Sequence, residues 1–173
     1  MLPEKKQITV MQMLLEKASK LELMRSFNTI SLPQIIEGNY PCIAVLESSY
    51  GLEKTEKALT ILTLDLAAAF ADDNKLQVEE LVVELTTSYR NLSLEDVYLV
   101  FKELKTKPIY GKLNNNKVLK EFKEYWDNRL IAYADYNYQK HLITKQDYGE
   151  RTNKTTEIAK HREAFKKHYL SKK

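Results

Sequence analysis

The stretch from Leu92 to Arg129 most constrains what this chain can fold into. It has the pattern of a capped helix, a turn that contains glycine and several lysines, and a second, long helix. Ser93 can cap the first helix, because Asp96 stands three residues later at the spacing of a capping box. Apolar residues then recur at intervals of three and four, which predicts one buried face on each helix.

The same periodicity covers most of the chain. The expected helices span 4–25, 32–37, 41–49, 52–71, 76–90, the stretch from Ser93 to Pro108, and 116–143. The 52–71 pattern is apolar on most of its circumference, which is typical of a central helix. Only 4 Gly and 4 Pro interrupt 173 residues. We therefore expect an all-α protein, a compact bundle of five or six helices over residues 1–148 with a basic C-terminal helical arm over residues 149–173.

Two of these helices carry more detailed expectations. Ser31 and Gln34 have the spacing of a capping box at the start of the 32–37 helix, which should stop at Gly38. Asn114 or Asn115 should cap the 116–143 helix. Its inward stripe is expected to be Leu119, Phe122, Trp126, Leu130 and Tyr133.

Charge is distributed unevenly along the chain. The net charge is only +3, but residues 1–101 hold 9 Lys and Arg against 15 Asp and Glu, whereas residues 102–173 hold 18 against 9. Such an asymmetry is typical of a chain whose basic end contacts a polyanion. The acidic half is either a surface for a protein partner or simply a solvated surface.

Several function classes lack support in the sequence. Cys42 is the only cysteine, which excludes an intrachain disulfide and a cysteine-based zinc site, and His161 and His168 have no third ligand for a metal. There is no glycine-rich phosphate loop and no His-Glu-x-x-His motif. Cys42 lies in an apolar run and is more typical of a small core residue than of a nucleophile. We therefore expect neither catalysis nor a cofactor.

The sequence also bears on location. Its first residues lack the apolar run of a signal peptide, and no stretch approaches the length of a membrane span. We expect no membrane partner and a cytoplasmic protein of a bacterium or an infected host cell, with the virion as the alternative.

Lysines gather around the predicted turn, where residues 102–123 hold seven lysines and two glutamates. The helical spacing predicts that Tyr98, Lys102 and Lys105 face solvent. Lysines neutralise phosphates and aromatic rings can stack on bases, so this region is a candidate interface for single- or double-stranded DNA with weak sequence specificity. A solvated, lysine-rich loop is the alternative. The candidate nucleic-acid-binding residues are Tyr98, Lys102, Lys105, Lys107, Tyr110, Lys112, Lys117, Arg129, Lys160, Arg162, Lys166 and Lys167.

A second aromatic and basic stripe is expected on the long helix. It comprises Tyr125, Arg129, Tyr136 and Lys140. These residues could form a base-stacking ladder. The more common alternative is that such tyrosines pack their rings at the edge of a core.

Three phrases of the sequence carry a family resemblance. They are Leu94-Glu95-Asp96-Val97 continuing to Phe101-Lys102, the turn from Tyr110 to Lys117, and the run from Val118 to Tyr125 that closes on Arg129. Together they resemble uncharacterised helical proteins of phages and prophage-like elements of gut bacteria. The run Lys105-Thr106-Lys107-Pro108 replaces part of the Gly-Lys-Tyr-Gly phrase usual in that family. Many small helical phage proteins of this layout serve replication.

The resemblance and the charge pattern together predict a non-catalytic accessory protein of phage or mobile-element DNA transactions, similar to a helicase loader. It would bind nucleic acid through its basic C-terminal half and a protein such as a replicative helicase through its acidic half. The alternative is a virion-associated or interaction module whose basic arm docks on a protein partner or on packaged DNA. A small enzyme is the third hypothesis, disfavoured because no acid, base and nucleophile converge in the pattern.

Overall fold

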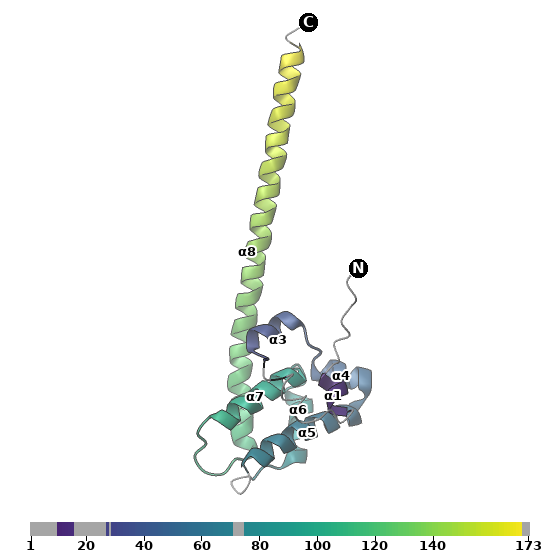
Figure 1. Cartoon of the computed structure of the whole chain (residues 1–173), viewed down its shortest axis with the longest axis vertical. Helices are drawn as coiled ribbons and strands as arrows, with labels where there is room; N and C mark the ends of the chain where they lie inside the picture. The colour runs from purple at the N-terminus through teal and green to yellow at the C-terminus, as the bar shows by residue number, and fades with distance from the viewer. Residues whose placement is uncertain (1–9, 16–26, 28, 71–74, 171–173) are drawn as a thin grey trace. The chain divides into compact units, whose positions relative to one another are not determined.

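The computed structural model describes residues 10–15, 27, 29–70 and 75–170, and the regular structure in these ranges is helical (Figure 1). The helices are α1 (Val10–Leu15), α3 (Leu32–Gly38), α4 (Ile43–Tyr50), α5 (Leu52–Phe70), α6 (Val78–Ser88), α7 (Leu94–Thr106) and α8 (Asn115–Leu170). Over the same ranges, the only β-type pairing is an isolated antiparallel bridge between Cys42 and Ser93. The predicted all-α class is confirmed.

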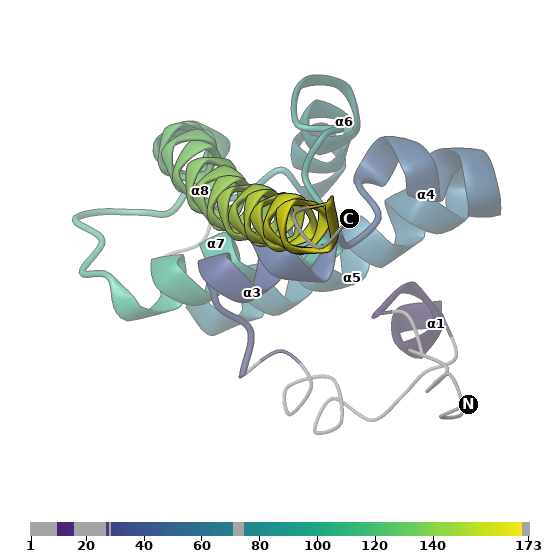
Figure 2. The ribbon, with the colours of Figure 1, turned by 90° about the horizontal axis from the view of Figure 1, so that it is seen from above.

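Contacts divide the chain into two units. The helical unit comprises residues 1–132, and the C-terminal unit comprises residues 133–173. Within the helical unit α5 is central, because it packs against α1, α4, α6 and α7 (Figure 2). Its apolar circumference predicted this position. The predicted 4–25 helix is described only as α1, and the remainder of that range lies outside the described residues.

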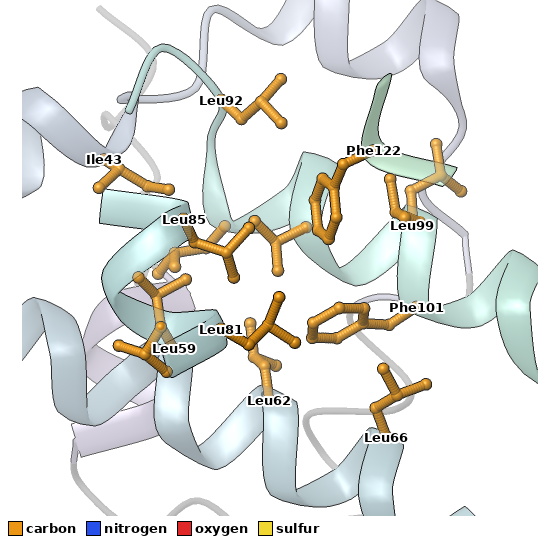
Figure 3. Packing of buried hydrophobic residues seen from close by; sticks show 14 of the residues in the cluster. Ile43, Leu59, Leu62, Leu66, Leu81, Leu85, Leu92, Leu99, Phe101 and Phe122 are labelled. Atoms are coloured by element: carbon orange, nitrogen blue, oxygen red, sulfur yellow. The ribbon is translucent and has the colours of Figure 1, made fainter. Parts of the chain in front are cut away.

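The core of the helical unit is built around two phenylalanines from different helices. Phe101 of α7 and Phe122 of α8 meet edge to face, with ring centroids 5.7 Å apart. Leu81 of α6 points toward this pair, and Leu62 of α5 lies beside it (Figure 3). Phe122 is fully buried and also contacts the Tyr89 ring at 5.3 Å between centroids. Long-range contacts between apolar side chains therefore join four helices at one place.

The start of α4 is held by the segment that leads into α7. The first N–H groups of a helix have no partner inside it. Here Ile43 N donates to Leu92 O at 2.8 Å, and Ala44 N donates to Arg90 O at 3.0 Å. An ion pair between Arg90 and Glu47, 3.1 Å apart, closes the same junction.

The short helix α3 begins as predicted and ends one residue later than predicted. Ser31 N donates to Gln34 Oε1 at 2.9 Å, so the predicted capping box is present. The helix includes Gly38, and Asn39 adopts the left-handed conformation at its end, with φ of 49°. Asn tolerates this conformation better than most residues. At Gly38 a Cβ would lie 2.5 Å from the Tyr40 ring, so a larger residue there would require that ring to move.

The long helix differs most from its prediction. α8 does not end at residue 143 but continues to Leu170, so no helix end marks the predicted domain boundary at 148/149. The contact-based division falls inside α8, after Ala132. The division by contacts therefore lies before residue 148, where the prediction from composition placed the end of the helical domain.

The buried face of α8 is also rotated relative to the predicted one. Val118, Phe122 and Tyr125 are buried, whereas Leu130 and Tyr133, predicted to face inward, are each 49% exposed. Leu119 and Trp126 lie at the edge of the core. The inward-facing prediction is confirmed for Phe122 and wrong for Leu130 and Tyr133.

Truncation of Phe122 should test the position of the core. We expect Phe122→Ala to lower the free energy of unfolding by about 3–5 kcal/mol, because it leaves a cavity between α7 and α8. Urea unfolding followed by circular dichroism measures this loss. The matched control is Val83→Ala, since Val83 is 55% exposed and should change stability by less than about 0.5 kcal/mol. Equal effects of the two substitutions would contradict the described packing.

Candidate nucleic-acid interface

The loop between α7 and α8 is built around one lysine. Asn114 caps α8, because its Oδ1 accepts a hydrogen bond from Lys117 N at 3.0 Å. The Lys117 ammonium folds back and donates to the carbonyl oxygens of Tyr110, at 2.6 Å, and Lys112, at 2.8 Å. Between these carbonyls, Gly111 adopts a φ of 71°, a conformation that favours glycine. Lys117, a predicted phosphate ligand, therefore holds the loop in place.

The end of the same loop is tied to the start of α6. Lys75 N donates to Leu113 O at 2.8 Å. Gln77 N donates to Asn115 Oδ1 at 3.0 Å, and Asn115 Nδ2 donates to Gln77 O at 3.1 Å. Leu113 itself is fully buried. These contacts fix the position of the loop within the helical unit.

Two of the lysines predicted to contact nucleic acid form ion pairs with carboxylates of the protein. Lys105 Nζ lies 2.5 Å from Asp65 on α5, and Lys107 forms a hydrogen-bonded ion pair with Glu121 on α8. The hydrogen bond from Glu121 raises the pKa of Lys107. Sequence reasoning missed both partners, because they lie 40 and 14 residues away along the chain. Both pairs remain partly exposed to solvent.

The other two lysines predicted around this turn differ in exposure. Lys102 is half-buried on α7, so the prediction that it faces solvent is only partly met, whereas Lys105 does lie at the surface. Lys112 is exposed in the loop, next to Gly111. Lys112 is therefore an exposed candidate lysine of this loop.

Tyr98 is half-buried, so the prediction that it faces solvent is only partly met. Its ring stacks on Phe27 with 4.1 Å between centroids and an interplanar angle of 15°. Burial raises the pKa of its hydroxyl, and the nearby Asp65 charge raises it further. Phe27 lies in a stretch where the helical periodicity is broken, so no pattern in the sequence indicated this contact. Phe27 thus occupies one face of the Tyr98 ring, and a base could stack on that face only after displacing it.

Arg129 is also engaged inside the protein. Its Nε donates to Asp96 Oδ1 at 2.8 Å, and the Tyr125 hydroxyl donates to the same oxygen at 2.6 Å. The other Asp96 oxygen accepts from Ser93 N at 2.8 Å and from Ser93 Oγ at 2.9 Å. Asp96 is fully buried, and burial followed by the Asp96 charge raises the pKa of Tyr125. This buried cluster joins α7 to α8 and leaves the Arg129 side chain only 21% exposed.

Glu95, next to this cluster, was not singled out from the sequence. It is 4% exposed on the first turn of α7. Burial raises the pKa of its carboxyl to about 7, with a smaller contribution from Asp96. Hydrogen bonds from its own backbone and from Ser93 act in the opposite direction. Acidic residues are common in the first turn of helices, where they are usually exposed and interact favourably with the helix dipole. The sequence therefore contains no sign that Glu95 is buried.

The predicted aromatic stripe of α8 is not continuous. Tyr125 is buried against Asp96, so it packs as a core-edge tyrosine and does not join a stacking ladder. Lys140 lies over the Tyr136 ring, 5.9 Å from its centroid. Tyr138 is 61% exposed and Ile143 is 67% exposed.

The remaining candidates lie near the end of α8. Lys160, Arg162, Lys166 and Lys167 are on its helical backbone, and their side chains lie outside the described residues. The same holds for His161 and His168. These four cations therefore share one helix.

Three further observations on the described part of the chain concern metal ligands, the position of Cys42 and membrane-spanning helices. No three His, Cys, Asp or Glu side chains gather there as metal ligands would. Cys42 is half-buried at the N-terminus of α4 rather than fully in the core. Among the described helices, none combines the length and the apolar character needed to cross a membrane.

No family model, no curated protein and no solved structure compared with this chain matches it significantly.

Substitution of Asp96 should uncouple α7 from α8. We expect Asp96→Ala to lower the free energy of unfolding by about 3–5 kcal/mol, because it removes the capping box and leaves Arg129 and Tyr125 without their acceptor. Thermal and urea unfolding measure the loss. The control is Asp65→Ala, which breaks the partly exposed pair with Lys105 and should cost at most about 1 kcal/mol. Comparable losses would show that the buried cluster does not couple the helices.

Glu95 should make stability depend on pH. Its carboxyl has a pKa near 7 in the folded protein and an ordinary, lower value when unfolded. The folded state therefore binds the proton more tightly, and stability should fall as pH rises from about 4.5 to about 7. Glu95→Gln should remove this fall and stabilise the protein at pH 8 by on the order of 2 kcal/mol. Urea midpoints at pH 5 and pH 8 for both proteins test this, and parallel pH profiles would contradict it.

Proposed function

We propose that this chain is a non-catalytic accessory protein that binds nucleic acid through the C-terminal part of α8, while its helical unit serves as a folded anchor. The observation that carries the proposal is the charge of the C-terminal unit. Residues 133–173 hold 10 Lys and Arg against 5 Asp and Glu, and α8 is helical through this unit as far as Leu170. Within this helix the cations recur at intervals of one to six residues from Lys140 to Lys167.

The length of this helix suits a phosphate backbone. At 1.5 Å per residue, the part of α8 from 133 to 170 extends about 57 Å. Double-stranded DNA carries one negative charge per about 1.7 Å of its axis, so several phosphates lie within reach of such a helix. Binding would release counterions and would therefore weaken steeply with salt. Lysine reads phosphate rather than base identity, which supports weak sequence specificity.

The ion pairs of the helical unit support placing the main contact on α8. Lys105 and Lys107 each lie against a carboxylate, and the Arg129 guanidinium contacts buried Asp96. Each acidic partner reduces the positive potential that an approaching phosphate would meet. We therefore propose the basic helix as the principal contact and the α7–α8 loop as a secondary one.

A protein partner remains part of the proposal. On α6, the acidic side chains of Glu79 and Glu80 are exposed beside Val83, which is 55% exposed. Such a mixed acidic and apolar face suits a basic protein partner. By analogy with small helical phage proteins, we extend the proposal to DNA replication as the setting and a helicase as the kind of partner. Exposed Tyr138 and Ile143 favour the second candidate, an interaction module that docks through α8 on another protein.

Neutralising the basic end of α8 tests the proposal. Fluorescence anisotropy of labelled single- and double-stranded DNA over a salt series measures affinity and its salt slope. We expect Lys166→Gln with Lys167→Gln to reduce the slope of log affinity against log salt by about 1–2, because up to two phosphate contacts are lost.

The matched control carries Lys54→Gln with Lys57→Gln on α5, which removes the same charge from the helical unit. It should leave the salt slope nearly unchanged. Equal losses for the two double variants would indicate an effect of net charge alone, and no binding of DNA by the wild-type chain at low salt would overturn the proposed function.

A further inference from the structure

The α7–α8 loop presents one aromatic ring to solvent in an unusual way. Tyr110 is 90% exposed, the highest value among the large apolar and aromatic side chains of the described residues. Its neighbour Ile109 packs against the core, and Leu113 is fully buried. The backbone is therefore anchored on both sides of Tyr110, while the ring itself stays in water.

The loop is held in this form by the protein's own hydrogen bonds. The Lys117 ammonium binds the carbonyls on both sides of Gly111 and lies 3.7 Å from where a Cβ of residue 111 would stand. These two hydrogen bonds from Lys117 restrict the conformations of the turn in the absence of any ligand. Preorganisation of this kind lowers the entropy cost of binding.

The charges around Tyr110 favour an anionic partner. No Asp or Glu occurs between residues 104 and 120, whereas this stretch holds five lysines. Three of the five, Lys105, Lys107 and Lys120, form ion pairs with carboxylates outside the stretch, and the other two are Lys112 and Lys117. Lys112, two residues after Tyr110, is exposed. The hydrogen bond from Lys75 N to Leu113 O brings another lysine of the chain beside the loop. A single-stranded nucleic acid offers both a phosphate for lysine and an unpaired base for the ring.

We infer that the 108–114 loop is a subsite for single-stranded nucleic acid, in which an unpaired base stacks on Tyr110 and Lys112 contacts the adjacent phosphate. Bases in a duplex are already stacked on each other, so this contact distinguishes single strands from double strands. The inference rests on the proposed function, since it assigns a base contact to a protein whose other contacts are to phosphate.

Anisotropy of the full-length protein with three labelled ligands tests the inference. The ligands are an oligothymidine, an abasic strand of equal length and a duplex. Tyr110→Ala should weaken binding to oligothymidine roughly tenfold, as loss of one base stack does, and leave the abasic strand and the duplex unchanged. Tyr110→Trp should preserve binding to oligothymidine. Its added fluorescence, relative to wild type with Trp126 alone, should be quenched on binding.

The control is Leu52→Ala, which removes a side chain that is 54% exposed on α5, outside both proposed contacts, and should leave binding of all three ligands unchanged. If Tyr110→Ala binds oligothymidine as the wild type does, while both retain salt-dependent binding, the subsite is overturned and the proposed function stands. An equal loss on the abasic strand would also overturn base stacking. Absence of binding by the wild type would overturn the proposed function and the subsite together. Matching melting temperatures for wild type and Tyr110→Ala would show that the variant is folded.

Discussion

The helical unit depends on the buried carboxylate of Asp96. A buried charge is costly unless hydrogen-bond donors surround it, and Asp96 receives four, from the Ser93 N–H, the Ser93 hydroxyl, the Tyr125 hydroxyl and Arg129 Nε. The contacts with Ser93 begin α7, and the other two fix the rotation of α8. Since Phe122, Tyr125 and Arg129 share one face of α8 at spacings of three and four, the same rotation directs Phe122 into the core. One side chain thus links helix capping, the helix–helix contact and the aromatic core.

Local features of the fold could be predicted from the sequence, because their physical causes lie within a few residues. The capping boxes at Ser31 and Ser93 and the central position of α5 follow from residue types at short spacings. The rotation of α8 could not be predicted in this way. By hydropathy, Leu130 is a better core residue than Tyr125, but Asp96 gives the tyrosine and the arginine a buried partner that the leucine cannot use. The inward stripe therefore follows the hydrogen-bonding cluster rather than the strongest apolar pattern.

The candidate interface was harder to predict than the fold, because charge in a sequence does not show where counter-charges lie. Seven lysines between residues 102 and 123 predicted a basic surface, yet Asp65 reaches Lys105 from another helix and Glu121 reaches Lys107 from α8. Lys117 has a structural role that depends on the carbonyls of a particular turn. Tyr110 and Lys112 are exposed in that turn, and their contact with nucleic acid stays a prediction. The prediction thus assigned contact roles to more residues of this loop than its ion pairs and hydrogen bonds leave open.

These ion pairs differ in how easily a phosphate could replace the carboxylate. Exposed pairs contribute little to stability, so Lys105 and Lys107 can turn toward a ligand at small cost. The gain is also small, because Asp65 or Glu121 then remains close to the phosphate as an unneutralised negative charge. Arg129 cannot make this exchange, since leaving Asp96 would strand a buried charge. Net attraction for a polyanion must therefore come from cations that are not ion-paired with a carboxylate of the protein. The location of such cations, rather than the total number of lysines, determines where a nucleic acid would bind.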